Sequence, residues 1–71
     1  MAKAFLYVDG LTTERNVDVV TDALASLDGV KSVVIDLTQK KAQISFDPKK
    51  VQLERMRWAV RQEGYTSRPR L

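Results

Sequence analysis

Residues 3–29, KAFLYVDGLTTERNVDVVTDALASLDG, carry the two signals that set the architecture of this chain. In residues 3–9 apolar side chains alternate with others, which predicts a strand that Gly10 ends. Beyond it apolar residues recur at helical spacing, and Thr12 or Thr13 is placed to cap the helix that they predict. This apolar stripe consists of Val17, Val20, Ala23, Leu24 and Leu27.

Three further strands and a second helix are predicted from the remaining residues. Residues 30–37 and 42–47 each alternate as a strand, and the polar residues 38–41 between them have the length of a hairpin connection. Residues 65–70 allow a short last strand, with a proline that suits a sheet edge. The apolar side of the second helix is marked by Leu53, Met56, Ala59 and Val60.

The predicted order of elements is strand, helix, strand, strand, helix, strand. Each strand–helix–strand crossover is expected to be right-handed, so both helices lie on the same side of the sheet. The predicted fold class is therefore α+β. It is a ferredoxin-like open-faced sandwich of βαββαβ order, with a four-stranded antiparallel sheet and two helices on one face.

Length and composition indicate one domain over residues 1–71, with a core over about 3–66 and a basic tail over 67–71. The chain is 44% hydrophobic and 30% charged, as in a globular protein rather than a disordered segment. No apolar run is long enough to span a bilayer, and no signal stretch is present. We therefore expect no membrane insertion and a cytoplasmic location.

The chain contains neither cysteine nor histidine, and these absences exclude several kinds of metal site and catalytic site. Without cysteine the chain has no disulfide, no thiolate metal site and no thiol redox chemistry. Without histidine it lacks the commonest general base and the commonest metal ligand. Its three glycines are isolated turn residues rather than a phosphate-binding loop. We predict that the protein is not an enzyme, has no catalytic residue and holds no cofactor.

Charge is distributed unevenly along the chain. Residues 1–48 carry five basic and seven acidic side chains, whereas residues 49–71 carry seven basic and two acidic ones, a net charge of +5. A basic second half of this kind favours an acidic partner, although the same charges also serve solubility.

Residues 8–16, VDGLTTERN, match an opening motif of valine, an acidic or similar residue and then Gly-Met-Thr-Cys-x-x-Cys, except at its methionine and its two cysteines. Further marks of the same family are Phe46-Asp47-Pro48 and Gly64-Tyr65. Through these motifs residues 3–66 resemble the heavy-metal-associated domain of copper chaperones, mercury-binding proteins and metal-transporting P-type ATPases. The resemblance implies the same sandwich fold.

The resemblance also implies where a metal site would lie, and the residues there indicate that it has been lost. Thr13 stands at the first cysteine position, Asn16 at the second, and Leu11 replaces the loop methionine. Cu(I) and Hg(II) favour polarisable thiolates, so a hydroxyl and a carboxamide are poor replacements. No metal is predicted at these former metal-loop positions: Leu11, Thr12, Thr13, Glu14, Arg15, Asn16 and Tyr65, which matches the family's tyrosine near the loop.

The function that the resemblance implies is that of a protein-interaction or regulatory module of metal-transport and chaperone lineage, rather than a Cu(I) carrier. A protein partner is expected. Its predicted contacts on the second helix are Arg55, Trp58 and Arg61, because a tryptophan between arginines is typical of protein interfaces. Phe5 and Tyr7, on the open face of the sheet, are the second predicted contacts.

Three alternatives stay open at this point. One is metal binding through non-cysteine ligands or through ligands that a partner supplies. Another is nucleic-acid binding through the basic second half and the exposed aromatic side chains, since RNA-recognition motifs of the same topology stack bases on their sheet. The oligomeric state is also open between a monomer and a weak homodimer formed through edge strands.

Overall fold

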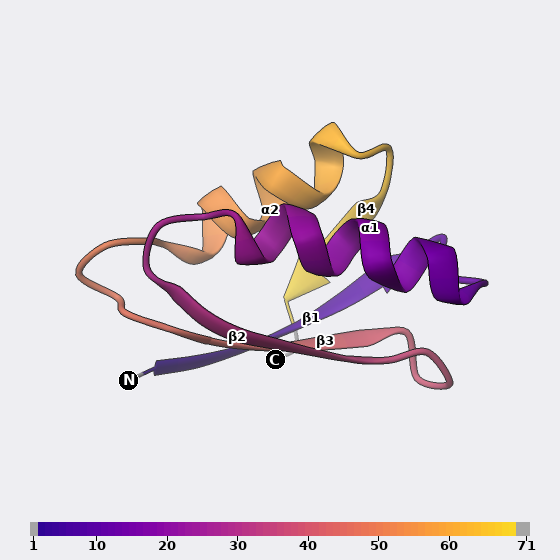
Figure 1. The fold of residues 1–71 in the computed structure, drawn as a ribbon, viewed down its shortest axis with the longest axis horizontal. Coiled ribbons are helices and arrows are strands. Elements are labelled where there is room, and N and C mark those ends of the chain that lie inside the picture. Colours follow the sequence, from indigo (N-terminus) through magenta and orange to yellow (C-terminus); the bar gives the residue numbers. More distant parts are fainter. Residues whose placement is uncertain (1, 70–71) are drawn as a thin grey trace.

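The computed structural model describes residues 2–69 and has the predicted βαββαβ order of elements (Figure 1). Thr13 caps the first helix, and Gly10 follows the first strand in the left-handed region of backbone space, at φ 99°. The elements are β1 (Ala2–Asp9), α1 (Glu14–Ala25), β2 (Val30–Asp36), β3 (Lys41–Phe46), α2 (Leu53–Gln62) and β4 (Thr66–Pro69).

The four strands form one sheet in the order β2-β3-β1-β4, and all three pairings are antiparallel. β1 therefore lies inside the sheet, where Leu6 is paired with Ala42 on one side and with Pro69 on the other. Both helices cover the same face of the sheet, and within residues 2–69 no helix or strand covers the opposite face (Figure 1). The predicted ferredoxin-like open-faced sandwich is confirmed.

The hydrophobic core lies between the sheet and the two helices. On β3 every second residue, at 42, 44 and 46, is buried, so one face of this strand is fully covered. Each helix contributes an apolar stripe to the same core. The core cluster consists of Leu6, Val8, Leu11, Val20, Leu24, Ala42, Ile44, Phe46, Val51, Met56 and Val60.

β2 departs from strict alternation at one point. Val30 is paired with Phe46, but the next pairing joins Ser32 to Ser45, so the register shifts across Lys31. A β-bulge of this kind accommodates one extra residue in one strand. It explains why the inward-facing apolar residues of β2 are spaced by three between Val30 and Val33 and by two afterwards.

β4 includes residues that the sequence placed in a basic tail. Ser67, Arg68 and Pro69 are paired with residues 6–8 of β1, while residues 70 and 71 of that predicted tail lie outside the described residues. Because β4 is an edge strand, a proline, which has no N–H to donate, is tolerated there. This pairing brings β4 alongside α2, and the two elements form a groove that is described below.

Candidate functional site

The loop between β1 and α1 is organised around the N-cap of the helix. Thr13 has an extended backbone, and its hydroxyl accepts a hydrogen bond from the backbone N–H of Asn16 at 3.3 Å. In return the side chain of Asn16 accepts from the backbone N–H of Thr13 at 3.1 Å. The pair forms a capping box in which asparagine takes the place usually held by glutamate or glutamine.

The carboxamide of Asn16 makes further hydrogen bonds in the same loop. Its Oδ1 also accepts from the backbone N–H of Thr12 at 3.1 Å, and from the hydroxyls of Thr12 and Thr13 at 3.0 and 3.1 Å. Its Nδ2 donates to the phenolic oxygen of Tyr65 at 2.6 Å. Both ends of the carboxamide therefore have partners within the chain.

Tyr65 reaches this loop because of the way α2 ends. The N–H of Gly64 donates to the carbonyl of Arg61 at 3.0 Å, and the N–H of Tyr65 donates to the carbonyl of Val60 at 3.3 Å. This is a Schellman motif, with Gly64 in the left-handed region at φ 91°. On the other side, a Cβ added to Gly10 would lie 3.0 Å from the Tyr65 ring. The absence of a side chain at Gly10 thus makes room for the tyrosine.

The remaining loop residues supply packing and surface charge. Leu11, at the position of the family's methionine, is fully buried in the core. Glu14 and Arg15 are exposed in the first turn of α1, where the positive end of the helix dipole favours the carboxylate of Glu14. Leu11 therefore contributes packing at a position where the family would carry a sulfur.

The donor set of this loop does not fit a soft metal ion. Thr13 and Asn16 offer neutral oxygen and nitrogen atoms, which bind Cu(I) far more weakly than thiolates do. Those atoms are also engaged with one another and with Tyr65. Within residues 2–69, no cluster of three or more histidine, cysteine, aspartate or glutamate side chains is placed to hold a metal. A hydrogen-bond network therefore lies at the positions that the resemblance assigns to the family's metal site.

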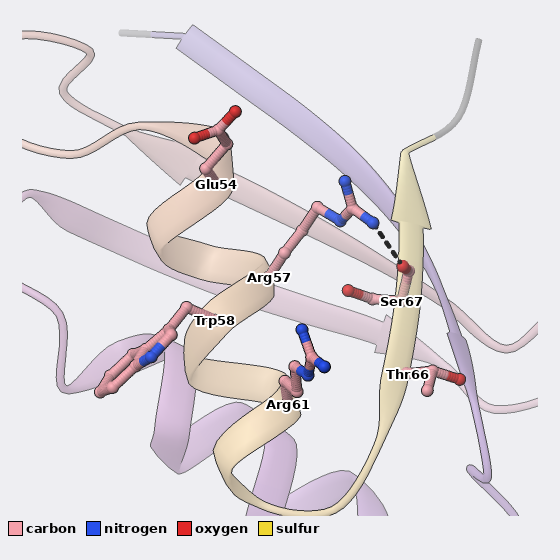
Figure 2. A pocket seen from close by; sticks show the side chains of 6 residues that line it. All are labelled: Glu54, Arg57, Trp58, Arg61, Thr66 and Ser67. Atoms are coloured by element: carbon pink, nitrogen blue, oxygen red, sulfur yellow. Dashed lines mark hydrogen bonds between the residues drawn. The ribbon is translucent and has the colours of Figure 1, made fainter.

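The second candidate region is the outer side of α2. Trp58 is 47% exposed, and the guanidinium of Arg55 stacks 4.2 Å from the centre of its ring. Arg61 lies on the other side of the helix, toward β4, as Figure 2 shows. The two arginines that flank the tryptophan in the sequence therefore lie on different sides of the helix, and of the two only Arg55 lies over the ring.

A groove of about 410 Å³ lies between α2 and β4, and Trp58 borders it (Figure 2). Arg57, which was not among the predicted contact residues, lines it together with Arg61, Thr66 and Ser67. The signal for Arg57 was its spacing of four from Arg61, because residues at i and i+4 share one side of a helix. A second hollow of about 420 Å³, lined by residues of both helices, lies on the α1 side of Trp58.

The open face of the sheet carries the two other predicted contact residues. Phe5 and Tyr7 are half-buried on β1, and a cation lies over each ring. Lys41 Nζ is 5.6 Å from the centre of the Phe5 ring, and the Arg68 guanidinium is 5.6 Å from that of Tyr7. The cations over these rings belong to β3 and β4, so the predicted sites fall on three kinds of surface: a loop, the outside of a helix and a sheet face.

A search of the described residues for membrane spans found no helix with the length and apolar character to cross a bilayer. The longer helix, α1, has 12 residues.

Residues 5–66 match the model of the heavy-metal-associated domain. The chain therefore belongs to the heavy-metal-associated domain family.

Known members of this family resemble the chain over almost its whole length. The copper chaperone CopZ of Staphylococcus haemolyticus is 31% identical over 65 residues, which cover 92% of this chain and 96% of that protein. CopZ of Bacillus subtilis is 32% identical over 65 residues, with 92% and 94% covered. A solved copper-binding domain from HMA7, a P-type ATPase, has a TM-score of 0.96 at 27% identity and covers 100% of this chain and 96% of that domain.

Proposed function

We propose that this domain is a protein-interaction or regulatory module of the metal-transport lineage, that it works in the cytoplasm without catalysing a reaction, and that it does not carry Cu(I). The observation that carries the proposal is the hydrogen-bond network of Thr13, Asn16 and Tyr65. It fills the family's metal position with neutral side chains that satisfy one another. A loop whose shape depends on these hydrogen bonds needs no ion to order it.

The proposed partner is another protein of metal transport. The relatives include copper chaperones and a copper-binding domain of a P-type ATPase, so a related domain of such an ATPase is the first partner to test. The contact would involve the outer side of α2, where Trp58 is 47% exposed and stacked by Arg55. A half-exposed tryptophan stacked by an arginine is a composition that protein interfaces favour.

One sample of ¹⁵N-labelled protein tests both parts of the proposal. Under anaerobic conditions, one equivalent of Cu(I) is expected to leave the amide signals of residues 11–17 and Tyr65 unchanged. Adding an unlabelled metal-binding domain of a P-type ATPase is then expected to shift the signals of α2. The Trp58→Ala variant is expected to weaken that shift, whereas Val34→Ala, which removes an exposed apolar side chain from β2, serves as its matched control.

Two results would contradict the proposal. Stoichiometric Cu(I) shifts in the loop would mean that other ligands bind the metal. An unchanged α2 spectrum after addition of the ATPase domain would remove the support for this kind of partner.

A further inference from the structure

We propose that the groove between α2 and β4 binds a carboxylate side chain of an acidic segment in the partner, next to Trp58. This inference rests on the proposed interaction function and adds the chemistry of the partner. Figure 2 shows the groove with α2 on one side and β4 on the other. It is lined by Glu54, Arg57, Trp58, Arg61, Thr66 and Ser67.

Two guanidinium groups line this groove, and both can donate hydrogen bonds to an anion. Arg57 donates one hydrogen bond, to the backbone carbonyl of Ser67 at 3.2 Å, which fixes the side chain across the groove and leaves its other donors available (Figure 2). Within residues 2–69, the side chain of Arg61 makes neither a hydrogen bond nor an ion pair. A planar carboxylate matches the paired N–H donors of such groups.

The other polar groups at the groove do not neutralise these arginines. Glu54 lies near one end, where Figure 2 shows its carboxylate apart from Arg61. The hydroxyl of Thr66 donates to Asp9 Oδ2 at 3.3 Å, so this carboxylate is engaged by β4. Arg68, the cation that β4 carries, lies over the Tyr7 ring. The groove therefore has two cations against one acid, within a second half of the chain whose net charge is +5.

Trp58 adds an apolar contact beside the charged one. It borders the groove and also the second hollow, on the α1 side, whose apolar lining includes Ala23, Leu27 and Ala59. An extended segment that crosses the ring would place a carboxylate between Arg57 and Arg61 and an apolar side chain in the second hollow. The partner segment is thus one in which acidic residues flank a leucine-like side chain.

The probe for this proposal is the peptide acetyl-Glu-Glu-Leu-Glu-Glu-amide, compared with acetyl-Gln-Gln-Leu-Gln-Gln-amide. In ¹⁵N spectra the glutamate peptide is expected to shift Arg57, Arg61, Ser67 and the Trp58 indole N–H, with an affinity that falls as salt rises. The glutamine peptide is expected to bind more weakly. An Arg57→Gln/Arg61→Gln variant is expected to lose about fivefold in affinity for the glutamate peptide, the loss of two exposed ion pairs.

The matched control is Arg15→Gln/Lys31→Gln, which removes the same charge from exposed positions outside the groove. Dispersed spectra of both variants verify that they fold. Equal binding of the two peptides would overturn the proposal, as would equal losses in the two variants. Shifts that appear with protein concentration alone would assign the groove to a second copy of this chain. Stronger binding of inorganic phosphate than of the glutamate peptide would assign it to phosphoryl groups.

The experiments test the proposed function and the groove proposal independently of each other. If the ATPase domain binds α2 but the glutamate peptide does not, the groove proposal is wrong and the interaction function stands. If Cu(I) shifts the amide signals of the loop, the proposed function fails, while the peptide titration still tests the groove proposal.

Discussion

Asn16 explains how the loop keeps its shape without a metal. The first N–H groups of a helix have no partner within the helix, and an ionic or polar acceptor must satisfy them. In this chain Oδ1 of Asn16 accepts from the N–H groups of Thr12 and Thr13, and Nδ2 connects the same side chain to Tyr65. One neutral side chain thus completes the capping box of Thr13 and fastens the loop to the end of α2.

Replacement of this side chain should therefore cost stability. We expect Asn16→Ala to lower the free energy of unfolding by about 1–2 kcal/mol, because it removes half of the capping box and the bond to Tyr65 together. Urea unfolding measures the change. The control is Gln39→Ala, which is expected to change the free energy of unfolding little. The carboxamide of Gln39 is exposed and makes no hydrogen bond among the described residues. Equal effects of the two substitutions would show that the network does not stabilise the loop.

The turns that join the elements depend on glycines in the left-handed region. Gly29, between α1 and β2, has φ 98°, and Gly64, after α2, has φ 91°. Their surroundings differ. A Cβ on Gly29 would lie 2.6 Å from Cβ of Lys50, whereas nothing lies within 4 Å of one on Gly64. The loop before α2 is thus packed directly on the α1–β2 turn.

This difference predicts two unequal losses of stability. Gly64→Ala is expected to cost about 1–2 kcal/mol, because alanine is strained at positive φ. Gly29→Ala carries the same strain and must also displace the backbone at Lys50, so we expect its loss in urea unfolding to be larger by at least about 1 kcal/mol. Gly64→Ala is the matched control for backbone strain. Similar losses for the two variants would mean that the α1–β2 turn is free to move away from the loop.

The elements could be predicted from the sequence because hydrophobic alternation and helical spacing report local structure. Even the bulge in β2 has a trace in the sequence, in the spacing of three between Val30 and Val33. The hydrogen bond between Asn16 and Tyr65 could not be predicted in this way, because it joins side chains 49 positions apart. Arg57 was missed for a related reason. The groove that it lines forms only when β4 pairs with β1 and so comes to lie beside α2.

The β1–α1 loop network and the basic groove are built from different side chains of the molecule. The β1–α1 loop and Tyr65 stand at the positions that the family resemblance assigns to the metal site, although the chain has no thiolate. The basic groove and Trp58 lie on the outer side of α2, on another part of the surface. None of the residues that line the groove belongs to the loop, so the loop can be altered without removing a groove side chain, and the scaffold around it should still accept a metal if thiolates are returned.

We expect the double variant Thr13→Cys/Asn16→Cys to bind Cu(I). Both positions lie at the start of α1, where the helix N-terminus favours a thiolate, and their spacing is that of a Cys-x-x-Cys motif. The variant loses its cap, so its melting temperature should fall without metal and rise with Cu(I), because a ligand that binds only the folded state stabilises it. Thr13→Ser/Asn16→Ser keeps small polar side chains without sulfur, and both it and the unaltered chain should show no rise with Cu(I). If the cysteine variant folds but its melting temperature stays unchanged at one equivalent of Cu(I), the scaffold has lost more than its two ligands.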